Sequence, residues 1–277
     1  MNLFMRYPGF KTKAFTMSYD DGVEQDMRLV EIMDKYSLKG TFNISSGLFA
    51  ADGTVYEKGR IHRPMTEKTA IKLYLDSGNE VALHGFTHPF LEQLPTNRAM
   101  YEIIEDRRRL ENHIGRIVRG MAYPFGTLND EVVSMIKSAG ISYARATKST
   151  EKFSLPAEPL RLQPTCHHNN PKLLKLGGEF LDKEVIHDPQ LFYLWGHSYE
   201  FEANDNWNVI EDFAKLISGD GGVWYATNIE IFDYIEAYKR LRFSVDMKIA
   251  ENPSSTDLFF SWNEKDYVVP AGETAVL

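Results

Sequence analysis

Short runs of β-branched and aromatic residues alternate along most of the chain with segments whose apolar positions recur at helical spacing. The runs that predict strands are Ala14–Tyr19, Thr41–Ile44, Glu80–Leu83, Gly120–Tyr123, Ser142–Ala146, Leu160–Gln163, Leu191–Gly196 and Val223–Thr227. The helical segments have apolar residues at Leu29, Ile32, Met33 and Tyr36, at Val132, Val133, Ile136 and Ala139, and at Val209, Ile210, Phe213, Leu216 and Ile217. The segment Thr227–Glu230 is typical of a capping box that opens a last helix.

Repeated β–α units indicate a parallel sheet with helices outside it. The many strand runs between Ala14 and Thr227 favour a barrel, and an open doubly wound sheet is the alternative. We therefore predict that residues 1–240 form an α/β domain, a distorted (β/α) barrel of seven to eight parallel strands.

The pattern changes from about Ser244 onward. The segments Phe243–Val245, Leu258–Phe260 and Tyr267–Val269 resemble short strands, and residues that favour turns separate them. Residues 241–277 are therefore predicted to form a small C-terminal β appendage.

Composition limits the classes of partner. The chain has 277 residues, and its net charge of −8 argues against a nucleic acid or an anionic membrane as partner. The single cysteine, Cys166, excludes an internal disulfide and fits a reducing compartment. No apolar run has the length of a signal or transmembrane segment, so the chain as given is expected to be cytoplasmic unless a leader has been trimmed. The sequence is compatible with a homo-oligomer.

Two adjacent carboxylates lie at the end of the first predicted strand. Side chains of neighbouring strand residues point to opposite faces, so Asp20 and Asp21 can share a site only where the strand ends. Gly22 supplies the turn that such an ending needs. The plainer alternative is a pair of acids that stabilises a helix N-terminus.

Two histidines, His84 and His88, follow the third predicted strand. One carboxylate with two imidazoles is a suitable ligand set for a divalent metal such as zinc, and it leaves a coordination position for water. The second carboxylate is then free to act as a base beside that water, which indicates hydrolysis. The alternative is a pair of loop histidines bonded to the backbone.

Other polar residues lie at the ends of later strands. Pro124, Arg145 and His197 follow or end the fourth, fifth and seventh strand runs, and all strand C-termini of a parallel barrel open on one face. His197 is predicted to be a general acid, with a structural histidine as the alternative. The run Cys166–His168 is better explained as a loop or substrate contact than as a second metal site. Trp195 is a candidate for stacking on a sugar or for packing.

These motifs, in this order, resemble the polysaccharide deacetylase family, carbohydrate esterase family 4, which includes chitooligosaccharide deacetylases. Met17–Gly22 is similar to the family's Thr-Phe-Asp-Asp-Gly motif, and His84–His88 has the spacing of its His-Ser/Thr-x-x-His motif. Ala122–Gly126 partly matches Arg-x-Pro-x-Gly, and Trp195–His197 is similar to Leu-x-His. The likeness extends from about Phe10 to Arg240.

The resemblance implies a distorted barrel and a metal-dependent hydrolase of carbon–nitrogen bonds other than peptide bonds, which removes acetyl groups from an N- or O-acetylated sugar or oligosaccharide. In it, a divalent metal, zinc first and cobalt or nickel as alternatives, polarises the acetyl carbonyl and activates water. The implied residues are Asp21, His84 and His88 for the metal, Asp20 as the base, His197 as the acid, and Tyr123, Pro124 and Trp195 for the substrate.

Two departures from the family pattern bear on the substrate. Ala122 stands where the family has an arginine that orients the base, and Arg145 is predicted to replace it, with a surface arginine as the alternative. The family's fourth motif, Asp-x-x-Asp-Trp, has no match in Arg145–Thr150, so no carboxylate partner for His197 is identified. Alternative functions are hydrolysis of another carbon–nitrogen bond, as in a cyclic ureide or amide, and a catalytically silent binding module.

Overall fold

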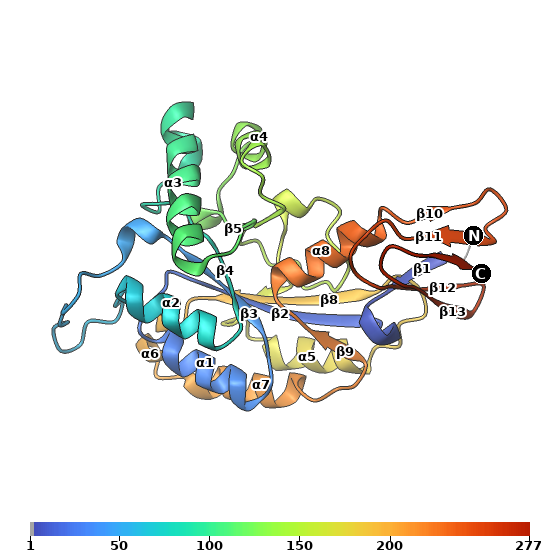
Figure 1. Cartoon of the computed structure of the whole chain (residues 1–277). Helices are drawn as coiled ribbons and strands as arrows, with labels where there is room; N and C mark the ends of the chain where they lie inside the picture. The colour runs from blue at the N-terminus through green and yellow to red at the C-terminus, as the bar shows by residue number, and fades with distance from the viewer. Residues whose placement is uncertain (1–2) are drawn as a thin grey trace.

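A single parallel sheet forms the centre of the molecule in the computed structural model, which describes residues 3–277 (Figure 1). The strand order is β6-β5-β4-β3-β2-β8-β7, and β9 also pairs with β2. The strands of this sheet are β2 (Lys13–Asp20), β3 (Gly40–Ile44), β4 (Glu80–Leu83), β5 (Gly120–Ala122), β6 (Tyr143–Arg145), β7 (Cys166–His167), β8 (Gln190–Gly196) and β9 (Val223–Tyr225). All of these pairings are parallel, as the β–α repeats predict.

The sheet curls into an incomplete barrel, which confirms the predicted barrel. Residues after β6 span the gap between the two ends of the sheet: Leu162 forms a bridge with Arg145 of β6, and Cys166 pairs with Leu194 of β8. The predicted strand Leu160–Gln163 is wrong, because Pro159–Arg161 form a 3-10 turn and proline has no amide hydrogen to donate to a strand partner.

Helices cover the outside of the sheet. They are α1 (Asp26–Lys35), α2 (Glu67–Asp76), α3 (Thr96–Ile114), α4 (Asp130–Ser138), α5 (Leu173–Asp182), α6 (Tyr199–Ala203), α7 (Trp207–Ile217) and α8 (Asn228–Tyr238). The predicted capping box is confirmed: the Glu230 amide donates to Thr227 Oγ1, and the Thr227 amide donates to Glu230 Oε2. Within residues 3–277, no helix is both long enough and apolar enough to cross a bilayer.

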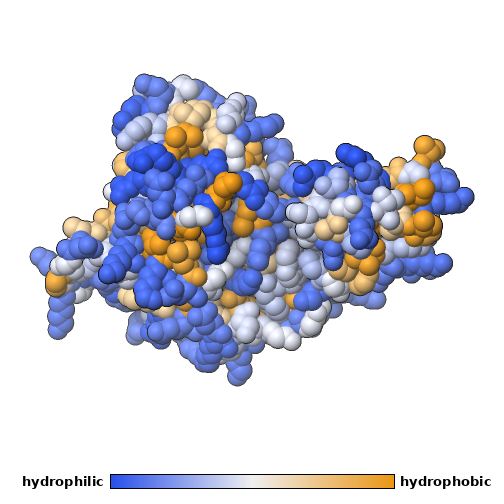
Figure 2. Space-filling view, in the orientation of Figure 1, coloured by the Kyte–Doolittle hydropathy of each residue, from blue (hydrophilic) through white to orange (hydrophobic). Residues whose placement is uncertain are grey.

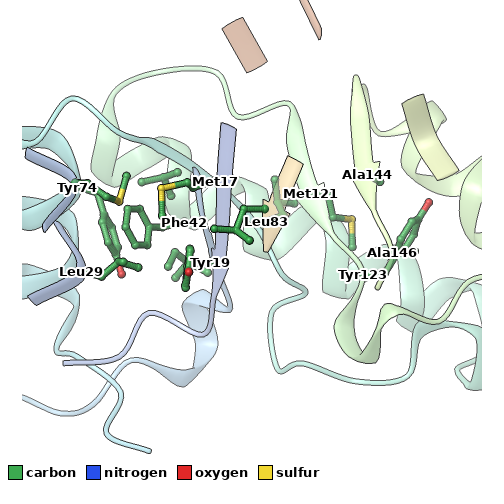
Figure 3. Packing of buried hydrophobic residues seen from close by; sticks show 14 of the residues in the cluster. Met17, Tyr19, Leu29, Phe42, Tyr74, Leu83, Met121, Tyr123, Ala144 and Ala146 are labelled. Carbon is green, nitrogen blue, oxygen red and sulfur yellow. The ribbon is translucent and has the colours of Figure 1, made fainter. Parts of the chain in front are cut away.

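The central strand β2 is the most completely buried element, with all eight residues buried. Met17 and Tyr19 of β2 belong to the same core cluster as Leu29 of α1 and Phe42 of β3 (Figure 3). Phe42 stacks on Tyr74 of α2 with ring centroids 4.4 Å apart. Since neighbouring strands hold both edges of β2 and the core holds its faces, the carboxyl end of β2 has a fixed position.

The C-terminal residues form the predicted β appendage, and the N-terminal strand joins it. One antiparallel sheet contains β1 (Leu3–Arg6), β12 (Leu258–Trp262) and β13 (Lys265–Val269), and a second contains β10 (Arg242–Phe243), β11 (Ile249–Glu251) and β14 (Thr274–Val276). Figure 1 shows both termini at this end of the molecule. The proposed boundary at Arg240 stays a prediction, and a division there would separate β1 from its partner β12.

Contacts of the appendage with the barrel are extensive. The Tyr234 hydroxyl of α8 donates to the Arg6 carbonyl at 2.7 Å and accepts from the Phe259 amide at 2.9 Å. Leu258 is fully buried in a cluster that includes Tyr7 and Tyr234. Figure 2 shows apolar surface at this end of the molecule. Two exposed apolar residues of the appendage are Val245 and Val276.

We expect a chain that ends at Arg240 to fold but to melt at a lower temperature. Removing β12 uncovers β1 and the cluster around Tyr7, and the loss of one buried leucine already costs about 2–5 kcal/mol. A loss of 2 kcal/mol lowers Tm by roughly 4–8 °C in a domain of this size. Thermal melting and light scattering measure this effect. Equal melting temperature and equal mass would show that the appendage is dispensable.

Candidate active site

The polar residues predicted at strand ends meet at one mouth of the barrel. Asp20 ends β2, His84 follows β4, Arg145 ends β6 and His197 follows β8. Asp20 Oδ2 lies 3.8 Å from His84 Nε2 and 3.9 Å from His197 Nε2. Residues that are far apart in the sequence therefore share one site.

Asp21, His84 and His88 present three ligand atoms to one another. Asp21 Oδ1 lies 3.8 Å from His84 Nε2 and 3.9 Å from His88 Nε2, and the two Nε2 atoms are 3.1 Å apart. Because His84 Nδ1 lies 2.8 Å from the Ala122 carbonyl, which can only accept, Nδ1 carries the proton and Nε2 is left with a free lone pair. A tetrahedral ion with ligand distances of about 2.0–2.1 Å holds its ligands at similar separations. These residues fit a divalent metal.

The backbone around the site adopts left-handed conformations that direct these side chains. Asp21 has φ 84° and His88 has φ 55°, which cost energy in residues other than glycine. Gly22 and Gly85, beside or near them, also have positive φ. The turn at Asp21 explains how two adjacent residues share a site: the strand ends at Asp20, and the positive φ of Asp21 lets both carboxylates lie 3.8 Å from His84 Nε2.

Asp20 is buried against a cation. Both of its oxygens accept from Arg145 Nη2 at 2.5 Å, and Oδ1 also accepts from Asn43 Nδ2 at 2.8 Å. Burial alone would raise the pKa of Asp20, but the Arg145 guanidinium, together with His84 and His197, outweighs burial and holds that pKa below its usual value. Asp20 is therefore an ionised carboxylate with a fixed orientation.

Arg145 reaches Asp20 from the strand next to the one that carries Ala122. Ala122 of β5 and Arg145 of β6 are direct partners in the sheet, so they lie at the same level of the barrel. The Arg145 side chain is fully buried, and its guanidinium carbon lies 4.6 Å from the centre of the Trp195 ring. The structure therefore places Arg145 inside the site and not at the surface.

The carboxylate beside His197 is Glu200, which sequence analysis missed. His197 Nδ1 lies 3.1 Å from Glu200 Oε1 on α6. Burial lowers the pKa of His197, but the hydrogen bond that its ring donates to Glu200 and the charge of Asp20 outweigh burial and raise that pKa. Glu200 is itself held by Asn169 Nδ2 at 2.8 Å and lies 2.9 Å from His168 Nε2. An acid three residues after a candidate catalytic histidine is the signal that could have identified it.

The run Cys166–His168 lies next to His197, and the ring centroids of His167 and His197 are 6.2 Å apart. His167, His197 and Glu200 place potential ligand atoms within 4.8 Å of one another. However, the Asn169 amide donates to His167 Nδ1 at 3.1 Å, so the ring proton is on Nε2, which faces Glu200 at 3.4 Å. A protonated nitrogen cannot bind a metal, and we interpret this group as a hydrogen-bonded cluster that surrounds Glu200.

The three predicted substrate residues lie in the packed wall behind the site. Tyr123 is 1% exposed and its hydroxyl donates to the Leu160 carbonyl at 2.7 Å, while Pro124 and Trp195 are also buried. This placement does not support direct contact between substrate and Tyr123 or Pro124. The exposed aromatic residues next to His88 are instead Phe90 and Phe125, whose rings stack with centroids 3.8 Å apart; Phe125 lies 4.5 Å from the His88 ring.

The comparison with family models and the comparison with solved structures agree with each other. Residues 8–144 match the family model described as polysaccharide deacetylase. The structure is similar to that of a Mycobacterium smegmatis protein assigned as a polysaccharide deacetylase, with TM-score 0.59, 15% identity and coverage of 84% of this chain and 93% of that chain.

Two further solved structures are similar to a smaller degree. A family 4 carbohydrate esterase from Streptomyces lividans in complex with acetate has TM-score 0.53, 17% identity and coverage of 78% of this chain and 93% of that chain. A CE4 family pseudoenzyme from Bacillus anthracis has TM-score 0.49, 20% identity and coverage of 83% of this chain and 68% of that chain. No curated protein sequence matches the chain.

At these identities the structural likeness describes the fold, and the match of the family model describes the sequence. The matched segment contains Asp20, Asp21, His84 and His88. Residues 8–144 of this chain therefore belong to the polysaccharide deacetylase family.

Proposed function

We propose that this protein is a metal-dependent hydrolase that removes acetyl groups from an N- or O-acetylated carbohydrate. The observation that carries the proposal is the convergence of Asp21, His84 and His88 beside the ionised Asp20 and the glutamate-bound His197. Family membership supports a carbohydrate substrate, and the acetate in the Streptomyces lividans relative supports an acetyl group.

The metal centre uses two nitrogen ligands and one oxygen ligand, a set that suits zinc, with cobalt or nickel as alternatives. A divalent ion held by Asp21, His84 and His88 would polarise the acetyl carbonyl and lower the pKa of water towards about 7. Asp20 is suited to accept the proton of the attacking water, because Arg145 keeps it ionised and fixes both of its oxygens.

His197 is suited to donate a proton to the leaving amine or alkoxide. Its Nδ1 faces Glu200, and its Nε2 faces the space beside Asp20 Oδ2, 3.9 Å away. A protonated imidazole in this position has its second N–H free for the substrate. Since Asp20 and His197 flank the same space, one can take a proton while the other gives one.

The rim of the site supports a sugar over a compact cyclic ureide. Phe90 and Phe125 are 37% and 50% exposed and form one aromatic surface beside His88. Exposed aromatic rings offer an apolar surface of large area, on which the carbon–hydrogen face of a pyranose ring can pack. The complete set of acid, base and ligand residues also supports catalysis over a silent binding module.

Asp20→Asn and Asp21→Asn should separate the roles of the two carboxylates. The Asp20 variant loses the base, so metal content should stay near one ion per chain while acetate release falls by about 10²–10⁴-fold. The Asp21 variant should lose metal as well. Metal analysis and acetate release from a panel of acetylated sugars measure both effects. Exchanged phenotypes would reverse the two roles, and a metal-loaded wild type that releases no acetate from the panel would refute the deacetylase proposal.

Arg145→Ala should destabilise the fold strongly. It leaves the Asp20 carboxylate buried without its cation, which typically costs about 3–5 kcal/mol, and acetate release should also fall. The matched control is Arg119→Ala, which removes a partly exposed ion pair with Asp233 and should cost no more than about 1 kcal/mol. Urea denaturation measures both; equal losses in the two variants would show that the buried pair has no special contribution.

Glu200→Gln should move the basic limb of the pH–rate profile to lower pH. As a general acid, His197 works in its protonated form, so activity falls as the pH rises through its pKa. Glu200 raises that pKa, and removing its charge therefore brings the loss of activity at lower pH. Glu211→Gln on α7, where the glutamate is exposed, is the control. An unchanged basic limb with unchanged kcat would make Glu200 a bystander.

A further inference from the structure

The segment Ile61–Met65 is attached directly to the turn that carries the predicted metal ligand Asp21. The Glu24 amide donates to the Arg63 carbonyl at 2.8 Å, and the Met65 amide donates to the Gly22 carbonyl at 2.9 Å. These bonds flank a short antiparallel bridge between Val23 and Pro64. The segment therefore follows any movement of the residues after Asp21.

A second set of contacts fixes the same segment to α6. Arg63 Nη1 and Nη2 donate to the two oxygens of Glu202 at 2.7 and 2.8 Å, and Arg63 Nε donates to Glu24 at 2.6 Å. Gln25 Nε2 donates to the Ile61 carbonyl at 2.7 Å and to Glu202 at 2.8 Å. A two-pronged guanidinium–carboxylate pair fixes orientation as well as distance. We call Arg63, Glu202, Glu24 and Gln25 the Arg63 clip.

His62 lies between these two attachments and faces Asp21. Its Nε2 is 3.4 Å from Asp21 Oδ2, while the other oxygen, Oδ1, faces His84 and His88. The His62 ring packs edge-to-face on Tyr199 of α6, with centroids 5.1 Å apart. The two oxygens of Asp21 are thus divided between the ligand trio and His62.

We propose that His62 is a positioning residue of the metal centre, and that the Arg63 clip holds it in place. A carboxylate can only accept, so His62 Nε2 acts as a donor to Oδ2 and keeps Oδ1 directed at the ion. Partners that hold a metal ligand in this way typically change metal affinity by 10–100-fold. The inference rests on the metal site of the proposed function, but it concerns binding of the ion and does not depend on the identity of the substrate.

The test is the affinity of purified protein for Zn²⁺ and Co²⁺, measured by competition with a chromophoric chelator. His62→Ala should weaken binding by about 10–100-fold with little change in the melting temperature of the metal-free protein, because the His62 side chain is 40% exposed. His62→Gln, which retains a donor, should restore most of the affinity. Lys58→Ala, an exposed residue in the same loop, is the control and should bind as wild type does.

The clip is tested with Arg63→Ala. It should weaken metal binding in the same direction, and adding it to His62→Ala should cause little further loss, since both changes act through one contact. Unchanged affinity in His62→Ala would overturn the proposal. So would a loss as large as that of His88→Ala, which would make His62 a direct ligand. Metal binding without acetate release would refute the deacetylase function alone, and the effect of His62 would still decide this inference.

Discussion

The ion pair between Asp20 and Arg145 crosses the interior of the barrel. Asp20 belongs to β2 and Arg145 to β6, and β3, β4 and β5 lie between them in the sheet. In a flat sheet these side chains would be far apart, so their direct contact requires the curl. Arg145 also donates to Ser18 Oγ at 3.3 Å, which ties it to β2 at a second point. This buried ion pair therefore requires a curled sheet, and it keeps Asp20 ionised at the mouth of the barrel.

The short helix α6 links the two halves of the site. Glu200, near its start, contacts His197, and Glu202, two residues further on, contacts Arg63 beside the turn that carries Asp21. The helix begins at Tyr199, three residues after the strand ends at Gly196, and an added Cβ on Gly196 would lie 2.0 Å from His168 Nδ1. This close approach requires glycine and lets His168 pack against the base of the helix. A segment of five residues thus orients groups on both sides of the reaction space.

Much of this arrangement follows from patterns that are local in the sequence. The strand runs located β2, β3, β4 and β8 to within a residue or two, and the parallel topology then required their carboxyl ends to share one face. The strands that were missed are short or pair with distant segments: β7 has two residues, and β1 finds its partner only near residue 260. Residues that tertiary contacts bring to the site carry no periodic signal. His62 is one of these residues. Its neighbour Arg63 binds Glu202, which lies 139 positions away in the sequence.

The pairing of β1 with β12 also bears on how the chain folds during synthesis. Leu3 aligns with Trp262, so the first strand emerges from the ribosome long before its partner exists. All the strands of the parallel sheet are made in between, and the barrel can assemble while β1 has an unsatisfied edge. Contacts between residues this distant are slow to form, and an unpaired apolar strand is exposed to association with other chains in the meantime. The pairing of β1 with β12 can form only after residues 258–262 have been made, and β1 is open to association with other chains until then.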